Sequence, residues 1–269
     1  MSRRLESRRA FVTGACSGIG AAIAERFAAE GAAVLVSGHV GQREKGEEIV
    51  ARIQRSGGTA AFAAADVRDE EGVERAVETC VERFGGIDAV VASAGVAAHP
   101  AQSYEGAGLL ELEAEHWSYV LGVNVAGTYL AARCAARRMV TEGKGGTIVT
   151  IGSVASKKPS GGVYAVSKAA VWMLTRVLAD ELAPRGIRVN CLAPGYTQTK
   201  LLAKRAGAAD SEDAQKWLRA RAALIPLGRL GTVEDMASAA VFLSCDESAY
   251  VTGSILHVDG GYVSTHAGG

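Results

Sequence analysis

Proline, cysteine and aromatic residues are scarce in this sequence. Its 269 residues include five prolines and five cysteines, and only 6% are aromatic. An odd and widely scattered set of cysteines is typical of reduced thiols rather than of a disulfide framework. None of the cysteines has the spacing of metal ligands, so we predict no metal site.

Excess charge of one sign and long apolar runs are also missing. The 29 basic and 29 acidic residues give a formal net charge of zero, which argues against a nucleic-acid partner. No wholly apolar run approaches the roughly 18 residues of a membrane span. The first arginines, Arg3 and Arg4, precede no apolar segment of a secretory signal. We therefore expect a cytoplasmic protein with no membrane partner.

The sequence does contain enough hydrophobic material, 48% of its residues, for one large core. Runs of Val, Ile, Leu and Ala alternate with helical patterns, which is typical of parallel strands covered on both faces. We expect a single doubly wound α/β domain over residues 1–269, because no linker or repeat divides it. The expected strands are 9–13, 33–37, 59–65, 87–92, 147–152, 187–192 and 254–258. The expected helices are 19–30, 44–54, 69–84, 163–182 and 232–243, and 113–140 is expected to be helical with interruptions.

Two helix starts carry capping signals. Asp69 is expected to cap the helix that follows it, and Thr232-Val233-Glu234-Asp235 has the pattern of a capping box. The polar stretch 196–221 is expected to be helical only in pieces.

A glycine-rich turn follows the first expected strand. Thr13-Gly14-Ala15-Cys16-Ser17-Gly18-Ile19-Gly20 has the spacing G-x-x-x-G-x-G and opens a helix. Its glycines let the backbone approach a pyrophosphate, and the helix start offers free N–H groups. A plain tight turn is the alternative, but the position within a βαβ unit favours dinucleotide binding. Cys16 stands where a thiolate is favoured, although a small filler in the loop is the simpler interpretation.

A tyrosine and a lysine four residues apart form the second candidate motif. Tyr164 and Lys168 lie on one helix face, and Ser153 at the end of a strand can reach the same place. A free phenol has a pKa of about 10, which a nearby ammonium lowers toward the range of a useful proton carrier. A surface pair is the alternative interpretation of these residues.

Further motifs follow in order along the chain. They are Asp66-Val67, Ala94-Gly95, Val123-Asn124-Val125, Ile151-Gly152-Ser153, Ile187-Arg188-Val189-Asn190, Pro194-Gly195 with Thr199, Pro226-Leu227-Gly228-Arg229, Thr252-Gly253 and Val258-Asp259-Gly260-Gly261. With these motifs the sequence resembles the short-chain dehydrogenase/reductase family over nearly its whole length, in particular its 3-ketoacyl-acyl-carrier-protein reductase-like members. The resemblance implies a Rossmann-type domain with a seven-stranded parallel sheet and a small helical substrate lid at 196–223. It also implies NAD or NADP as cofactor, a small carbonyl or alcohol substrate and a homotetramer.

The resemblance assigns roles to particular residues. Tyr164 is implied to be the general acid in reduction and the general base in oxidation, and Lys168 to lower its pKa and hold the nicotinamide ribose. Ser153 is implied to polarise the substrate oxygen, and Asn124 to help hold a proton-relay water. The implied cofactor-binding residues are Gly14, Ser17, Gly18, Ile19, Gly20, Gly38, His39, Asp66, Val67, Ala94, Gly95, Tyr164, Lys168, Pro194, Gly195, Thr197 and Thr199.

Three departures from the family pattern bear on the pocket. The usual Asn-Asn-Ala-Gly is Ala92-Ser93-Ala94-Gly95, which loses an Asn side-chain contact. Ser153 and Tyr164 are 11 residues apart, about two fewer than is usual in the family, so one wall is altered or a surface loop is trimmed. The segment Val96 to Glu113 is longer than in many relatives and offers His99 and Tyr104 as pocket-mouth candidates.

The cofactor phosphate has no obvious strong partner. Gly38 stands where NAD-dependent members carry an acidic residue, so the block to NADP is absent. His39 and Ser17 stand at positions that are often basic, and a neutral imidazole is a weaker anion partner than a guanidinium. Arg43 could fold back toward them or remain a solvated helix residue. We predict a modest preference for NADP, with use of NAD left open.

The leading function is therefore an NAD(P)-dependent alcohol dehydrogenase or ketone reductase. A narrower alternative is reduction of a 3-ketoacyl thioester, with Lys144 and Arg185 as a basic patch for an acidic carrier. An alternative from another class is a cofactor-binding regulatory protein that has lost catalysis, against which the complete set of catalytic residue types argues.

Overall fold

Seven short apolar runs form one parallel sheet in the computed structural model, which describes residues 3–100, 108–157, 161–199, 202 and 211–263. The strands are β1 (Arg9–Thr13), β2 (Ala33–Gly38), β3 (Thr59–Ala64), β4 (Ala89–Ala92), β5 (Gly146–Ile151), β6 (Ile187–Pro194) and β7 (Ile255–Val258). Their order is β3-β2-β1-β4-β5-β6-β7, and every neighbouring pair is parallel. The predicted doubly wound sheet is confirmed.

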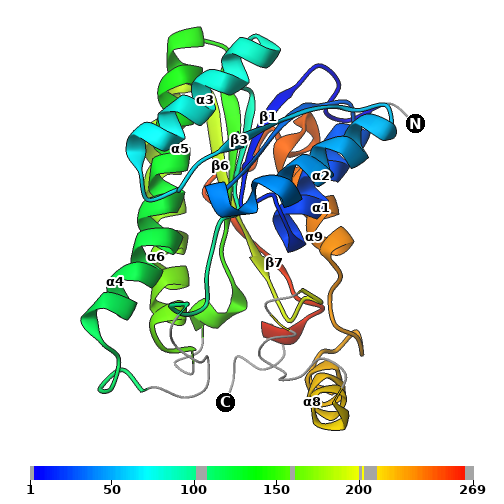
Figure 1. The fold of residues 1–269 in the computed structure, drawn as a ribbon, viewed down its shortest axis with the longest axis vertical. Helices are drawn as coiled ribbons and strands as arrows, with labels where there is room; N and C mark the ends of the chain where they lie inside the picture. The colour runs from blue at the N-terminus through cyan, green and yellow to red at the C-terminus, as the bar shows by residue number, and fades with distance from the viewer. Residues whose placement is uncertain (1–2, 101–107, 158–160, 200–201, 203–210, 264–269) are drawn as a thin grey trace.

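Alternate strand residues point into two separate hydrophobic cores. Val12 and Val34 pack on one face of the sheet, whereas their neighbours Phe11 and Leu35 pack on the other. The first face is covered by α1 (Gly18–Ala29), α2 (Arg43–Arg55) and α9 (Val233–Ser244). The second is covered by α3 (Glu70–Phe84), α5 (Gly127–Glu142) and α6 (Gly162–Leu182), as Figure 1 shows. Because both faces are covered, the strands need no polar alternation.

The two predicted helix caps have different outcomes. The capping box at Thr232 is confirmed, since its hydroxyl accepts from the Asp235 N–H at 3.2 Å and the Asp235 carboxylate accepts from the Thr232 N–H at 2.8 Å. The prediction that the Asp69 side chain caps α3 is wrong. Asp69 precedes α3 with an extended backbone, but its side chain accepts no capping hydrogen bond and lies 3.5 Å from the Arg75 guanidinium instead.

The expected helical run at 113–140 is interrupted, as predicted, by a change of helix type. It consists of α4 (Ala114–Leu121), a π-helical turn over Gly122–Ala126, and α5. A π turn inserts an extra residue into the helical repeat and is frequent at functional sites. Here it contains Asn124.

The order of the strands places a crevice at one edge of the sheet. The chain proceeds outward from β1 to β3 and then from β4 to β7 on the other side, so the connections after β1 and β4 separate. Ligands of open α/β sheets bind at this switch point, beyond the carboxyl ends of the strands. The helix α8 (Glu212–Ala223), part of the expected lid, lies beyond the same edge (Figure 1). Among the described helices, none combines the length and apolar character needed to cross a membrane.

Candidate functional site

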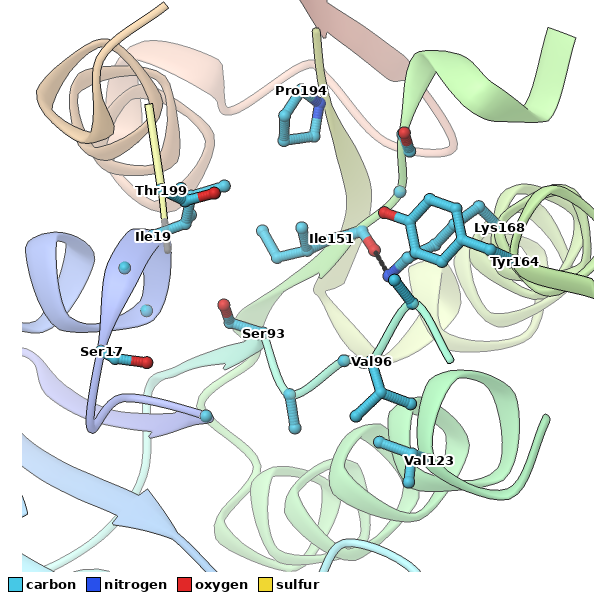
Figure 2. Close-up of a pocket in the computed structure, with 18 of the residues that line it drawn as sticks. Ser17, Ile19, Ser93, Val96, Val123, Ile151, Tyr164, Lys168, Pro194 and Thr199 are labelled. Carbon is cyan, nitrogen blue, oxygen red and sulfur yellow. Dashed lines mark hydrogen bonds between the residues drawn. The ribbon is translucent and has the colours of Figure 1, made fainter. Parts of the chain in front are cut away.

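A pocket of about 630 Å³ opens at the carboxyl edge of the sheet. Every cofactor-binding residue predicted from the sequence lines it, as do Ser153, Tyr164 and Lys168. Figure 2 shows Tyr164 and Lys168 on one side of this pocket and Ser17, Ile19 and Thr199 on the other. Asn124 is buried and does not line the pocket.

The glycine turn between β1 and α1 fits tightly against the turn after β4. A Cβ on Gly14 would lie 2.7 Å from the Ala94 Cα, and one on Gly20 would lie 2.5 Å from the Gly14 carbonyl oxygen. The Thr13 hydroxyl joins the two turns, because it accepts from the N–H groups of Ser93 and Ala94 at 3.1 and 3.2 Å. Larger side chains would separate these backbones.

The start of α1 has the features of an anion-binding site. Ser17 precedes the helix with an extended backbone and makes no side-chain capping bond, so the first N–H groups of the helix remain available. Gly18 has a φ of +57°, and the nearest atom to a Cβ placed there is the Thr199 Cγ2 at 3.9 Å. The uncapped helix start and this open space fit the pyrophosphate of a dinucleotide.

An acidic and a basic residue meet at the end of β3. Arg68 Nε donates to Asp66 Oδ1 at 3.0 Å, and this hydrogen bond lowers the pKa of Asp66. The Arg68 guanidinium also stacks over the Tyr119 ring at 5.2 Å. Arg68 lines the pocket and was not predicted from the sequence, although it stands only two residues after Asp66.

The candidates for a cofactor phosphate lie at the end of β2. His39 Nδ1 accepts from the Gly41 N–H at 3.2 Å and caps the 3-10 turn Val40–Gln42, so a neutral ring carries its proton on Nε2. Arg43 does not fold back toward His39. Its guanidinium pairs with Glu47 at 3.2 Å and stacks over Phe62 at 5.4 Å.

The Cys16 thiol fills the space beside Gly38. A Cβ on Gly38 would overlap the Cys16 Sγ and lie 3.1 Å from the Gln42 Oε1. Burial raises the pKa of Cys16, which contradicts the expectation that the helix start favours a thiolate and supports the simpler role of a loop filler.

Lys168 lies at the bottom of the pocket, next to the strand β5. Its side chain is 4% exposed, and its Nζ donates to the Ile151 carbonyl at 2.8 Å. The Nζ lies 5.8 Å from the centre of the Tyr164 ring, one helical turn earlier on α6. Ser153 follows β5, and its hydroxyl accepts from the Ala155 N–H at 3.1 Å. Burial lowers the pKa of Lys168 to about 8.

Asn124 connects three segments behind Lys168. Its Nδ2 donates to the Val96 carbonyl and to the Ser167 Oγ, both at 2.9 Å, and its Oδ1 accepts from the Val96 N–H at 2.8 Å. The Ser167 hydroxyl donates in turn to the Tyr164 carbonyl at 2.7 Å. A Cβ on Gly95 would lie 3.4 Å from both the Asn124 Oδ1 and the Lys168 Nζ. Ser167, which was not predicted, thus links Asn124 to the turn of α6 that carries Tyr164.

The loop after β6 borders the opposite side of the pocket. The Thr197 hydroxyl donates to the Gly195 carbonyl at 3.2 Å. The Thr199 hydroxyl accepts from the Leu202 N–H at 3.2 Å, which leaves its own proton for another acceptor. A Cβ on Gly195 would lie 2.8 Å from the Asp259 Cα, so the tail of the chain fixes this loop in place.

The two candidates for the pocket mouth, His99 and Tyr104, are not among the described residues that line the pocket. His99 stacks on His116 at 4.4 Å and packs edge-on against Tyr119 at 4.8 Å, and it does not line the pocket. Tyr104 lies outside the described residues, as do residues 158–160 of the short Ser153–Tyr164 connection and 200–201 and 203–210 of the expected lid.

The low pKa of Lys168 predicts a stability that rises with pH. Between about 8 and the usual value of about 10.4, the unfolded chain binds this proton more than the folded chain does. The free energy of unfolding should therefore increase through this window, by up to roughly 3 kcal/mol. Urea unfolding of the cofactor-free protein at a series of pH values measures the rise. Lys168→Met should remove most of it, and equal pH slopes in the two proteins would contradict the assignment.

The chain matches known dehydrogenases along nearly its whole length. A sequence model of the family described as enoyl-(acyl carrier protein) reductase matches residues 14–263. Glucose 1-dehydrogenase 2 of Bacillus subtilis is 36% identical over 97% of this chain and 96% of its own. The 3beta-hydroxysteroid dehydrogenase 1 of Eggerthella lenta is 39% identical over 96% of this chain and 94% of its own.

A solved structure shows the same fold. Gluconate 5-dehydrogenase from Burkholderia cenocepacia, in complex with NADP and tartrate, has a TM-score of 0.85 and 34% identity over 98% of both chains. The resemblance seen in the motifs is thus confirmed, and an NAD(P)-dependent oxidoreductase acting on alcohol or carbonyl groups is the corresponding function. The chain belongs to the short-chain dehydrogenase/reductase family.

Proposed function

We propose that Tyr164 is the general acid when this enzyme reduces a ketone and the general base when it oxidises an alcohol. The supporting observation is that Tyr164, Lys168 and Ser153 line the same pocket as the glycine turn. A bound nicotinamide cofactor supplies the hydride exchange with the substrate carbon. In reduction the Tyr164 hydroxyl donates its proton to the carbonyl oxygen, and in oxidation the phenolate accepts the proton of the alcohol.

Ser153, Lys168 and Asn124 support this proton transfer. The Ser153 hydroxyl accepts from the Ala155 N–H and so keeps its own proton for the substrate oxygen. When protonated, Lys168 stabilises the phenolate, and its remaining N–H groups are donors for the nicotinamide ribose. Asn124 forms hydrogen bonds with Val96 and Ser167 and so fixes the positions of both segments. These segments then define the site of a relay water next to Lys168.

We infer a modest preference for NADP over NAD. The end of β2 carries no carboxylate that would repel a 2′-phosphate, because Gly38 stands there. The Nε2–H of His39 and the hydroxyl of Ser17 are neutral donors toward that phosphate. Neutral donors are weaker than a guanidinium, so the preference is small.

The proposed activity predicts turnover of reduced cofactor with uncharged ketones. Absorbance of the reduced nicotinamide is followed with NADPH and then NADH, against cyclic and aromatic ketones and ketoacyl thioesters, and in reverse with the alcohols. We expect turnover with both cofactors and a lower KM for NADPH. A KM for NADH lower by about 100-fold would contradict the inferred preference. Cofactor binding without turnover in either direction would favour the regulatory alternative.

The position of Lys144 and Arg185 does not support the alternative in which a carrier protein docks on them for ketoacyl reduction. Lys144 precedes β5 and Arg185 precedes β6, and their loops adjoin through the Gly146 N–H and the Gly186 carbonyl at 3.2 Å. They therefore lie at the amino edge of the sheet, separated from the pocket by the length of β5, roughly 20 Å. A carrier bound there would face away from the pocket, so these two residues do not support docking for ketoacyl reduction.

We propose that the whole chain, residues 1–269, forms one domain and assembles into a homotetramer. An apolar stripe on α6 supports assembly, since Val166, Met173 and Val177 are 42%, 58% and 54% exposed. Their spacing of seven and four residues places them on one face of the helix. A second copy of the chain would cover this face.

A further inference from the structure

Beyond Ser153 the pocket continues into an apolar end. Val154, Tyr196, Leu202 and Tyr262 line the pocket, and all four belong to one hydrophobic cluster between the lid and the tail of the chain. Val154 directly follows Ser153, so the cluster begins next to the group proposed to hold the substrate oxygen. Val154, Leu202 and Tyr262 are otherwise buried, so each contributes only a small part of its side-chain surface to the pocket.

Aromatic packing fixes this wall in place. The Tyr196 ring packs edge-on against Tyr262 at 5.3 Å and against Trp217 of α8 at 6.3 Å. The Arg221 guanidinium stacks on Trp217 at 4.7 Å and on Tyr196 at 5.7 Å, and it does not line the pocket. The arginine therefore supports the wall from outside.

Charged groups among the described lining residues lie elsewhere in the pocket. Asp66 and Arg68 pair with each other at the end of β3. Lys168 donates to the carbonyl of Ile151 beneath the proposed proton donor. A substrate carboxylate at the apolar end would thus lose its water without gaining a charged partner among the described lining residues, because Arg221 lies against the Tyr196 ring outside the lining. Such a loss of water is unfavourable.

We propose that the substrate is an uncharged ketone or secondary alcohol that carries an apolar ring or branched chain, not a sugar acid. The inference rests on the proposed function, since Tyr164 and Ser153 define where the reacting oxygen lies. The hydrophobic group then occupies the space bounded by Val154, Tyr196 and Tyr262, where removing it from water is favourable.

A matched pair of ketones tests the substrate class. One is cyclohexanone with a tert-butyl group opposite the carbonyl, and the other carries a carboxylate in place of the tert-butyl group. We expect kcat/KM to be higher for the tert-butyl ketone by about 100-fold or more. Equal values, or a preference for the carboxylate, would overturn the substrate class while leaving Tyr164-dependent turnover intact. Turnover of the ketones that is unchanged in Tyr164→Phe would instead contradict the proposed function.

Binding gives a readout that does not depend on turnover. In Tyr164→Phe protein loaded with cofactor, the tert-butyl ketone should change the fluorescence of Trp217, which packs against Tyr196. Trp217→Phe should remove the change. A signal given equally by the carboxylate ketone would overturn the proposal.

Two variants of Leu202 test whether the apolar wall determines the preference between the two ketones. Leu202→Arg places a cation at the apolar end and should shift the ratio of kcat/KM toward the carboxylate ketone by at least roughly tenfold, whereas Leu202→Met should keep the apolar preference. Thermal unfolding checks that both variants fold. Arg219→Gln, at an exposed position of α8 outside the pocket lining, should leave the ratio unchanged. If turnover of the carboxylate ketone depended on Arg221, the proposal would be overturned.

Discussion

Replacing Tyr164 with phenylalanine should lower kcat by roughly 10²- to 10⁴-fold, the usual contribution of a positioned general acid or base. The change removes one hydroxyl and keeps the ring that lies 5.8 Å from the Lys168 Nζ. The measurement is the rate of cofactor oxidation with a small uncharged ketone under saturating conditions.

Two controls separate proton transfer from binding and folding. Tyr250→Phe makes the same chemical change at a fully exposed position outside the pocket and should leave kcat unchanged. Cofactor affinity, measured by the fluorescence of bound NADPH, should remain close to that of the unaltered chain in Tyr164→Phe. If Tyr164→Phe retained more than about a tenth of kcat, another group would have to be the proton donor.

Local patterns explain why much of this site could be predicted from the sequence. The glycine spacing at 14–20 and the Tyr164–Lys168 pair are short-range features, because a turn or a single helical face brings their members together. Runs of Val and Ile indicated the buried strands for the same reason. The order of such elements then fixed which strand ends meet at the pocket.

Contacts between distant segments explain what the sequence left hidden. Asn124 lies in a π turn. Its side chain forms hydrogen bonds with Val96, 28 residues earlier, and with Ser167, 43 residues later. Thr13 holds the turn after β4 across 80 residues. No helical or strand periodicity encodes these hydrogen bonds, so neither Ser167 nor Thr13 stood out as a site residue.

The sequence also did not indicate how deeply the Cys16 thiol is buried, and this burial changes the expected pKa of the thiol. The start of a helix favours a thiolate, but the thiol is packed beneath Gly38 and burial raises its pKa. The same contact joins the glycine turn to the end of β2, where family members select between NAD and NADP. We therefore expect cofactor selection in this chain to involve two positions rather than one.

Gly38→Asp alone should fail to produce an efficient NAD-dependent enzyme. The new Cβ would overlap the Cys16 Sγ, so the thiol or one of the two turns must move, and overpacking of this kind costs about 1–3 kcal/mol of stability. Because Cys16 is packed inside the glycine turn, this shift should weaken binding of both cofactors. Gly38→Ala should share this loss without adding charge, which separates the steric effect from the electrostatic one.

Adding Cys16→Ala to Gly38→Asp should restore the site and reverse its preference. The Cys16 Cβ would lie 3.6 Å from the new Cβ, an ordinary contact, so removal of the sulfur relieves the overlap with Cys16. The remaining close contact, 3.1 Å to the Gln42 Oε1, is with the end of a flexible side chain that can shift. The carboxylate introduced at the end of β2 can then accept from the ribose hydroxyls and repel a 2′-phosphate. The ratio of kcat/KM for NADH over NADPH should rise by roughly 10- to 100-fold relative to the unaltered chain. Urea unfolding and kinetics of the single and double variants complete the cycle. Additive effects, or an efficient NADH enzyme from Gly38→Asp alone, would show that Cys16 does not control this position.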